Sequence, residues 1–181
     1  MKLTGVSRME FVIDFEYDEN VVKMYHASLG TVFTNEGRKF GREYTLEQTR
    51  NRLYEASKSK NKNGFDLLGF LKIYDDNNKL VGLSFPRKVI PSEYDINMLS
   101  PLHEYYRLSG IYIDEEARGQ GIALKVLEWF RDKFEYVLWT ADEENRSSIR
   151  VAEKAGLRMT VKRPVLDIEG NYLYTVAAFS N

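Results

Sequence analysis

The sequence predicts an α/β (α+β) fold. Short apolar or alternating runs, which favour strands, are mixed along the chain with segments whose apolar residues recur at helical spacing. The 181 residues are 43% hydrophobic, which is enough to bury an independent core. We therefore expect one domain over residues 1–181, with about seven strands and about four helices in the order β-α-α-β-β-β-α-β-α-β-β.

The first third of the chain predicts one strand and two helices. Residues 9–15 alternate weakly between apolar and polar side chains, as a strand does. A helix is expected over residues 18–30, because the aspartate at its start can cap it and the glycine at its end can close it. A second helix opens with a capping box of Thr45 and Gln48 and is expected to end near Lys60.

The middle of the chain predicts a hairpin and then a long loop. Residues 67–74 and 80–85 are typical of strands, and the polar run 75–79 between them is typical of a turn. Residues 86–104 hold three of the four prolines and show no clear periodicity, so we expect a loop insertion of the kind that often carries function. The remaining elements are expected at 105–113, 136–140, 158–166 and 172–179 as strands, and at 120–133 and 146–155 as helices.

The most informative segment is 108–123. It predicts a strand, an acidic turn, a glycine-rich elbow and the start of an amphipathic helix. Gly119 and Gly121 leave backbone N–H groups uncovered where the helix dipole is positive, which favours a bound pyrophosphate. A strand-to-helix turn can also need glycine for steric reasons alone, so this feature by itself does not decide the function.

Three phosphate-binding patterns can be compared with this elbow. A Walker loop ends in Gly-Lys-Ser/Thr, but Gly121 is followed by Ile122 and Ala123. A dinucleotide fingerprint needs a third glycine where Leu124 stands. The pattern Arg/Gln-x-x-Gly-x-Gly/Ala is met by Arg118, Gly121 and Ala123. This segment resembles the coenzyme A pyrophosphate loop of the GNAT superfamily of acyl-CoA-dependent N-acyltransferases.

A second block lies where that family would have it. After the apolar strand at 137–140, Asn145 is a good helix cap and Gly156 a natural residue beyond the helix end. The phrase Asn-x-x-Ser followed by Glu-Lys-Ala-Gly-Leu resembles the family's second conserved helix, most closely in the branch that acetylates ribosomal-protein N-termini. A capped surface helix would look similar, but two blocks in the right order strengthen the resemblance, which covers residues 105–160.

The resemblance implies a GNAT-like sheet, mixed but mostly antiparallel, and a defined chemistry. It implies transfer of an acetyl group from acetyl-CoA to a primary amine by direct attack in a ternary complex. The acceptor would be a small-molecule amine, an aminoglycoside or polyamine, or a peptide N-terminus. The residues that the resemblance assigns to the cofactor are Ile111 and Ile113 for pantetheine, Arg118, Gly119, Gln120, Gly121, Ile122 and Ala123 for the pyrophosphate, and Asn145 and Ser148 on the second helix.

The same resemblance suggests catalytic and acceptor-binding residues. Glu104 is the predicted base, because relatives carry a glutamate near the start of this strand and an alkylamine is mostly protonated at neutral pH. Many relatives place a tyrosine where this chain has Ala152, so Ser148, one turn earlier, is the predicted donor to the departing thiolate. A helix-surface or capping role would suit this serine equally. Tyr112 and Tyr105 are further possible donors. Carboxylates and aromatics near the loop suit a cationic acceptor, and the predicted contacts are Glu93, Tyr94, Glu104 and Tyr105.

Composition excludes several other kinds of protein. There is no cysteine and there are two histidines, so no metal site is expected. A net charge of −1 and the lack of a long apolar run argue against nucleic-acid and membrane partners, and we expect a cytoplasmic monomer or homodimer. Two rival functions remain: a non-catalytic acyl-CoA-binding regulatory module, which Ala152 favours, and an unrelated nucleotide-phosphate binder.

Overall fold

The structure is a computed structural model that describes residues 8–30, 44–58, 66–89, 103–166 and 172–180. Its helices and strands follow the predicted order, with one additional short strand and one short 3-10 helix. The elements are β1 (Glu10–Asp14), α1 (Glu19–Gly30), α2 (Leu46–Lys58), β2 (Asp66–Leu67), β3 (Phe70–Tyr74), β4 (Leu80–Lys88), β5 (Tyr106–Ile113), η3 (Glu115–Ala117), α3 (Ile122–Lys133), β6 (Val137–Asp142), α4 (Arg146–Lys154), β7 (Arg158–Leu166) and β8 (Tyr172–Ser180).

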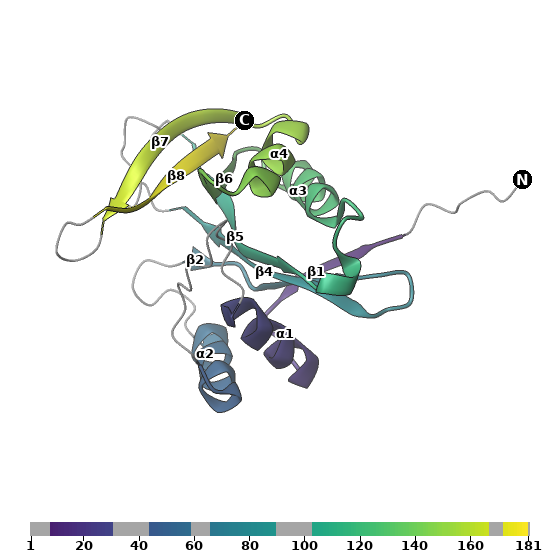
Figure 1. Cartoon of the computed structure of the whole chain (residues 1–181). Coiled ribbons are helices and arrows are strands. Elements are labelled where there is room, and N and C mark those ends of the chain that lie inside the picture. Colours follow the sequence, from purple (N-terminus) through teal and green to yellow (C-terminus); the bar gives the residue numbers. More distant parts are fainter. Residues whose placement is uncertain (1–7, 31–43, 59–65, 90–102, 167–171, 181) are drawn as a thin grey trace, which may run out of the picture.

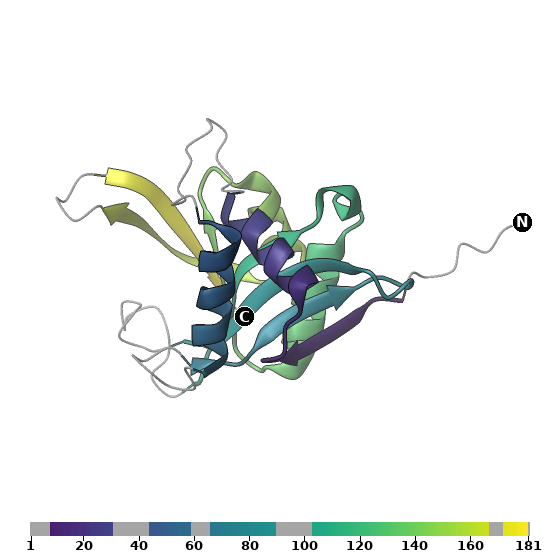
Figure 2. The same cartoon turned by 90° about the horizontal axis from the view of Figure 1, so that it is seen from below.

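One twisted sheet organises the described part of the chain. Its strand order is β1-β3-β4-β5-β6-β8-β7, and β2 adds to β4 outside this path. Neighbouring strands are antiparallel except β5 and β6, which are parallel, so the expected mixed and mostly antiparallel sheet is confirmed. The β7–β8 hairpin reaches out past the rest of the sheet (Figure 2).

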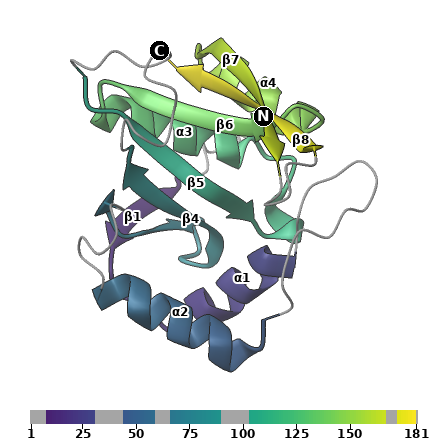
Figure 3. The same cartoon turned by 90° about the vertical axis from the view of Figure 1, so that its left-hand side faces the viewer.

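The four α-helices of the described residues cover both faces of the sheet. α1 and α2 lie on one face, and α3 and α4 lie on the other (Figures 1 and 3). On the α3 side, Val126, Leu127 and Phe130 pack on the sheet with no exposed surface. On the α1 side, Val22 and Leu53 belong to a second cluster with strand residues. Burial of such side chains contributes roughly 1.5–3 kcal/mol each, so both layers stabilise the fold.

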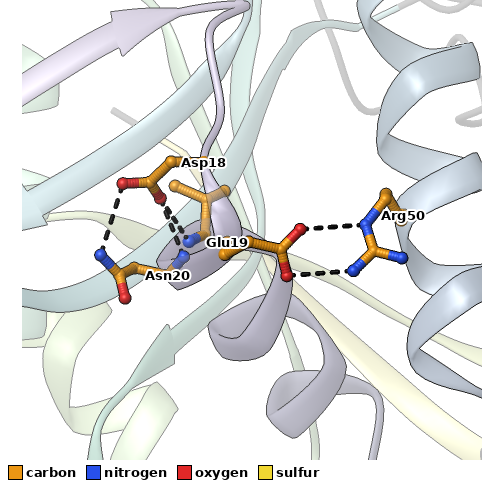
Figure 4. A network of polar contacts seen from close by, with 5 residues as sticks. Asp18, Glu19, Asn20 and Arg50 are labelled. Carbon is orange, nitrogen blue, oxygen red and sulfur yellow. Dashed lines mark hydrogen bonds and ion pairs between the residues drawn. The ribbon is translucent and has the colours of Figure 1, made fainter.

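The N-termini of α1 and α2 form as the sequence predicts. The Asp18 carboxylate accepts hydrogen bonds from the backbone N–H groups of Asn20 and Val21, at 2.9 and 3.0 Å. Asp18 is drawn in Figure 4 beside the ion pair of Glu19 with Arg50, which joins α1 to α2. At α2, Thr45 and Gln48 satisfy each other's backbone N–H groups reciprocally, which confirms the capping box.

β4 corrects the predicted start of the proline-rich loop. The loop was expected from residue 86, but β4 continues to Lys88, and Pro86 pairs with Leu108 inside the sheet. Proline lacks an N–H donor, so a sequence pattern favours a strand end at this position. The strand continues here because the Pro86 carbonyl still accepts from the backbone N–H of Leu68, while β5 covers the other edge. The predicted loop residues 90–102 lie outside the described residues.

Two irregularities of β5 shape the centre of the sheet. Against β4 its register shifts between Leu83 and Phe85, and Gly110 bulges there with a φ of 60°, which is in the left-handed region. Against β6, β5 forms two pairs, Tyr106 with Val137 and Arg107 with Leu138. Beyond these pairs the two parallel strands diverge, so the sheet opens toward their carboxyl ends.

Candidate active site

A cavity of about 1080 Å³ lies where β5 and β6 diverge. Its walls come from β5, the loop into α3, the first turn of α3, the second half of β6 and α4. It also reaches the other face of the sheet, where Tyr25 and Ser28 of α1 and Phe85 of β4 line it. The cavity therefore connects the two faces through the opening in the sheet.

The glycine-rich loop forms one end of this cavity. Gly119 and Gly121 have φ angles of 77° and 72°, in the left-handed region that favours glycine. Gly121 is also the N-cap of α3, and no side chain caps that end. A Cβ added at either glycine would meet no atom within 4 Å, so the space in front of the loop is open. Backbone N–H groups of the first turn thus face an open space at the positive end of the helix dipole.

Basic side chains predominate among the charged residues of the described lining. Arg118 lines the cavity just before α3, Arg150 and Lys154 line it from α4, and Arg107 lines it from β5. Asp142 is the one acidic side chain in this described lining. Four cations and one carboxylate suit a ligand with several negative charges, such as a nucleotide with phosphate groups.

The Arg118 side chain supports the loop. Its Nε donates a hydrogen bond to the Ile113 carbonyl at 3.0 Å, and its Nη1 lies 3.4 Å from the Glu115 carboxylate. Its guanidinium also lies over the Tyr112 ring, 5.6 Å from the centroid. These contacts join the loop to the end of β5, so the side chain also has a structural role. Ile113 is one of the two residues whose backbone was predicted to pair with pantetheine, and its carbonyl accepts this bond from Arg118.

The other predicted cofactor residues are mostly brought together. Ile111, Ile113, Gly119, Gly121, Ile122 and Ala123 line the cavity, whereas the exposed Gln120 is not among the described lining residues. On α4, Asn145 caps the helix, and its side-chain oxygen accepts from the Ser148 backbone N–H at 3.1 Å. Tyr112 and Ser148, two of the predicted catalytic residues, also line the cavity.

Ser148 has a hydrogen-bond partner that the sequence did not suggest. Its hydroxyl oxygen accepts from the indole Nε1 of Trp139 at 3.0 Å, and both residues line the cavity. Ala152, at the position where relatives carry a tyrosine, is fully buried in the core between α3, α4 and the sheet. Ser147 and Ser148 both line the cavity from α4, but the Ser147 hydroxyl donates to Asn145.

Glu104 is separated from the residues that line the cavity. Its carboxylate pairs with Lys88 and accepts from the Tyr106 hydroxyl at 3.2 Å. The Tyr106 ring stacks on Phe134 just past α3, so this cluster lies on the α3 face, away from Tyr25 of α1. The hydrogen bond from the Lys88 ammonium and its charge lower the pKa of the Glu104 carboxyl. Glu104 is not among the described lining residues, and its role as a base stays a prediction.

The predicted acceptor contacts are only partly described. Glu93 and Tyr94 lie outside the described residues. Tyr105 is buried against Tyr136 with ring centroids 5.6 Å apart, and it is not in the described lining. The residues that do line the cavity on the α1 face were missed: Tyr25, Ser28, Leu29, Phe85 and Arg107. Tyr25 and Leu29 share the apolar face of a helix and Phe85 belongs to a strand, which favours packing roles, and no local signal reveals that α1 lies over an opening in the sheet.

Within the described residues, no group of three or more His, Cys, Asp or Glu side chains is placed to hold a metal ion. No helix among them is long and apolar enough to cross a membrane.

The diverging parallel strands over a glycine-rich helix start define an α/β protein whose loop backbone is suited to a phosphate-bearing ligand. Residues 18–158 match the family model described as acetyltransferase (GNAT) domain. The chain therefore belongs to the GNAT family of N-acetyltransferases, as its two motifs indicate. No curated protein matches the chain.

Solved structures share this fold at low sequence identity. Spermidine N-acetyltransferase from Vibrio cholerae, solved with CoA and spermine, is 16% identical with a TM-score of 0.64, over 96% of this chain and 94% of that one. The protein yncA from Salmonella typhimurium, solved with acetyl-CoA, is 16% identical with a TM-score of 0.61, and the match covers 98% of this chain and 94% of that one. The ribosomal-protein-S18-alanine N-acetyltransferase from Escherichia coli is 10% identical with a TM-score of 0.56, and the match covers 96% of this chain and 92% of that one.

Proposed function

We propose that this protein transfers the acetyl group of acetyl-CoA to a primary amine. The observation that carries the proposal is the cavity that joins the α3 loop on one face of the sheet to the α1 face on the other. A thioester held from the first face and an amine entering from the second would meet inside the sheet. Direct attack needs this geometry, because both reactants must be bound at once.

The fit of coenzyme A to the cavity is supported by its charge and backbone. The loop around Gly119 and Gly121 offers N–H donors to the pyrophosphate, and Arg150 and Lys154 suit a further phosphate. Beyond its two pairs with β6, the edge of β5 would pair with the amides of pantetheine. The Gly110 bulge would turn a backbone N–H toward the thioester oxygen, where negative charge develops during the attack.

The residues then divide the chemistry between them. The amine nitrogen forms a bond to the carbonyl carbon and loses a proton, while the carbon–sulfur bond breaks and the sulfur gains one. Ser148 is proposed to donate a hydrogen bond to the departing sulfur, and Tyr112, which also lines the cavity, is the alternative donor. Water in the cavity is proposed to take the amine proton, because Glu104 is occupied by Lys88 on the α3 face.

The acceptor is proposed to enter beside α1. Tyr25 and Phe85 lie there with ring centroids 4.7 Å apart and would contact an alkyl or cationic amine. Glu93 and Tyr94 stay proposed contacts from the preceding loop. These features suit a small amine, a polyamine or a peptide N-terminus, and a screen of such amines with acetyl-CoA, following thiol release, tests the proposal.

A second candidate function is an acyl-CoA-binding module without turnover. The observation that favours it is the buried Ala152 at the position of the usual tyrosine. Tight binding of acetyl-CoA without thiol release for any amine would support this candidate against the enzyme. Stabilisation of the fold by ATP or NAD and not by coenzyme A would contradict both.

A further inference from the structure

A buried tryptophan holds the hydroxyl of Ser148 in the wall of the cavity. Trp139 is 3% exposed, and its indole N–H, its one polar group, donates to Ser148 Oγ at 3.0 Å. A buried donor left without a partner costs about 1–3 kcal/mol, so this contact fixes the pair strongly. It joins the middle of β6 to the first turn of α4.

The direction of this hydrogen bond decides what the hydroxyl can do. A serine hydroxyl has one proton and two acceptor positions. One acceptor position of Ser148 is filled by Trp139, and its backbone N–H is taken by Asn145. Among the residues that the structure describes, no acceptor is recorded for the Ser148 hydroxyl proton. Its neighbour Ser147 differs, because that hydroxyl donates to Asn145 at 2.9 Å.

We propose that Trp139 is a positioning residue that leaves the Ser148 proton directed into the cavity, toward the sulfur of coenzyme A. This inference rests on the proposed function, since the sulfur must lie beside α4. An alcohol is a weaker acid than a thiol, so Ser148 stabilises the developing thiolate by a hydrogen bond. Water then delivers the proton that the sulfur keeps and takes up the proton that the amine loses, which leaves Ser148 unchanged.

Trp139 acts by orienting the Ser148 side chain, because without this hydrogen bond the hydroxyl could rotate to another acceptor. A serine in a helix readily donates to the carbonyl one turn back, which would remove its proton from the cavity. The indole favours the rotamer in which the oxygen faces Trp139 and the proton faces away from it. Phenylalanine at 139 would keep the apolar ring but not this preference.

The kinetic test is a double-mutant cycle on the holoprotein with acetyl-CoA and an acceptor amine. Ser148→Ala is expected to lower kcat by about 10-fold to 100-fold, and Trp139→Phe by about 3-fold to 10-fold, with unchanged affinity for acetyl-CoA. In the Ser148→Ala background, Trp139→Phe should have no further effect. Equal losses in both backgrounds would overturn the positioning role. Trp129→Phe is the matched control, because Trp129 packs on Phe11, outside the cavity lining.

A binding test works without turnover. If the Ser148 proton faces the sulfur, it stabilises the thiolate of coenzyme A, so the affinity for coenzyme A relative to acetyl-CoA should rise with pH. That rise should be about 3-fold to 10-fold smaller in Trp139→Phe and absent in Ser148→Ala. If this relative affinity rises with pH but no amine is acetylated, the inference is supported and the proposed function is contradicted. The same pH dependence in wild type and both variants would overturn the inference.

The chain has two tryptophans, which gives an independent check of the contact. In a nitrogen–proton spectrum, Ser148→Ala should move the indole signal of Trp139 and leave that of Trp129 in place. An unmoved Trp139 signal would show that the hydrogen bond is not formed in solution and would overturn the inference.

Discussion

Substitution of Gly121 tests the phosphate-binding loop most directly. The residue has a φ of 72° and caps α3 without a side-chain hydrogen bond. A side chain there has room, since no atom lies within 4 Å of the added Cβ, but it would project into the space before the loop. Gly121→Ala and Gly121→Val should therefore fold and lose affinity for coenzyme A.

The structure sets the size of both effects. The left-handed conformation costs a residue with a Cβ about 1–2 kcal/mol, which lowers Tm by about 2–8 °C in a protein of this size. Each hydrogen bond to a charged group contributes about 1.5–3 kcal/mol, so the loss of one weakens binding by about 10-fold to 150-fold. We expect this loss for Gly121→Ala, and binding below detection for Gly121→Val, which blocks several donors.

Gly156 provides the matched control. Its φ is 78°, and an added Cβ would meet the flexible end of Arg131 at 3.2 Å. Gly156→Ala should show a similar fall in Tm with unchanged affinity, because Gly156 is outside the described cavity lining. Isothermal titration calorimetry with coenzyme A makes the comparison. An unchanged dissociation constant in Gly121→Val would refute the pyrophosphate-loop assignment.

Three other substitutions test the catalytic and structural assignments. Ser148→Ala should lower kcat by about 10-fold to 100-fold at constant affinity for acetyl-CoA, and an equal kcat would leave a capping role. If water takes the amine proton, Glu104→Gln should change kcat/KM by less than about 3-fold at any pH, whereas a loss at neutral pH that shrinks as pH rises would support Glu104 as the base. Lys88 lowers the pKa of Glu104, so the ionised carboxylate stabilises the fold at pH values above the pKa that Glu104 has in the unfolded chain. The difference in Tm between wild type and Glu104→Gln should therefore vanish as the pH falls through the lowered pKa of the folded protein. Asn145→Ala removes the α4 cap and should lower Tm by about 2–4 °C in calorimetry, whereas an unchanged Tm would show that the cap is replaceable.

Local chemistry made much of the fold predictable. The caps at Asp18 and Thr45 and the glycines of the α3 loop act within a few residues, so their sequence patterns suffice. The extension of β4 past Pro86 was missed because its support comes from β2 and β5, which are distant in sequence.

The candidate site was predictable where it is built from two contiguous motifs. Residues of the α3 loop and Ser148 were identified because each motif brings its members together by itself. Trp139 was read only as part of an apolar strand, since nothing in the chain predicts which α4 residue its indole meets. The contribution of α1 and the pairing of Glu104 with Lys88 likewise depend on the register of the sheet.

The short pairing of β5 with β6 is a weak connection between two parts of the sheet. One half of the sheet, β1-β3-β4-β5, joins the other, β6-β8-β7, through two residue pairs and the helices above them. An extended ligand lying in the opening would act as the missing strand and couple the two halves mechanically. Amide exchange in β6 and β8 should then slow together with that in β5 when ligand binds, so the cosubstrate would also serve as part of the architecture.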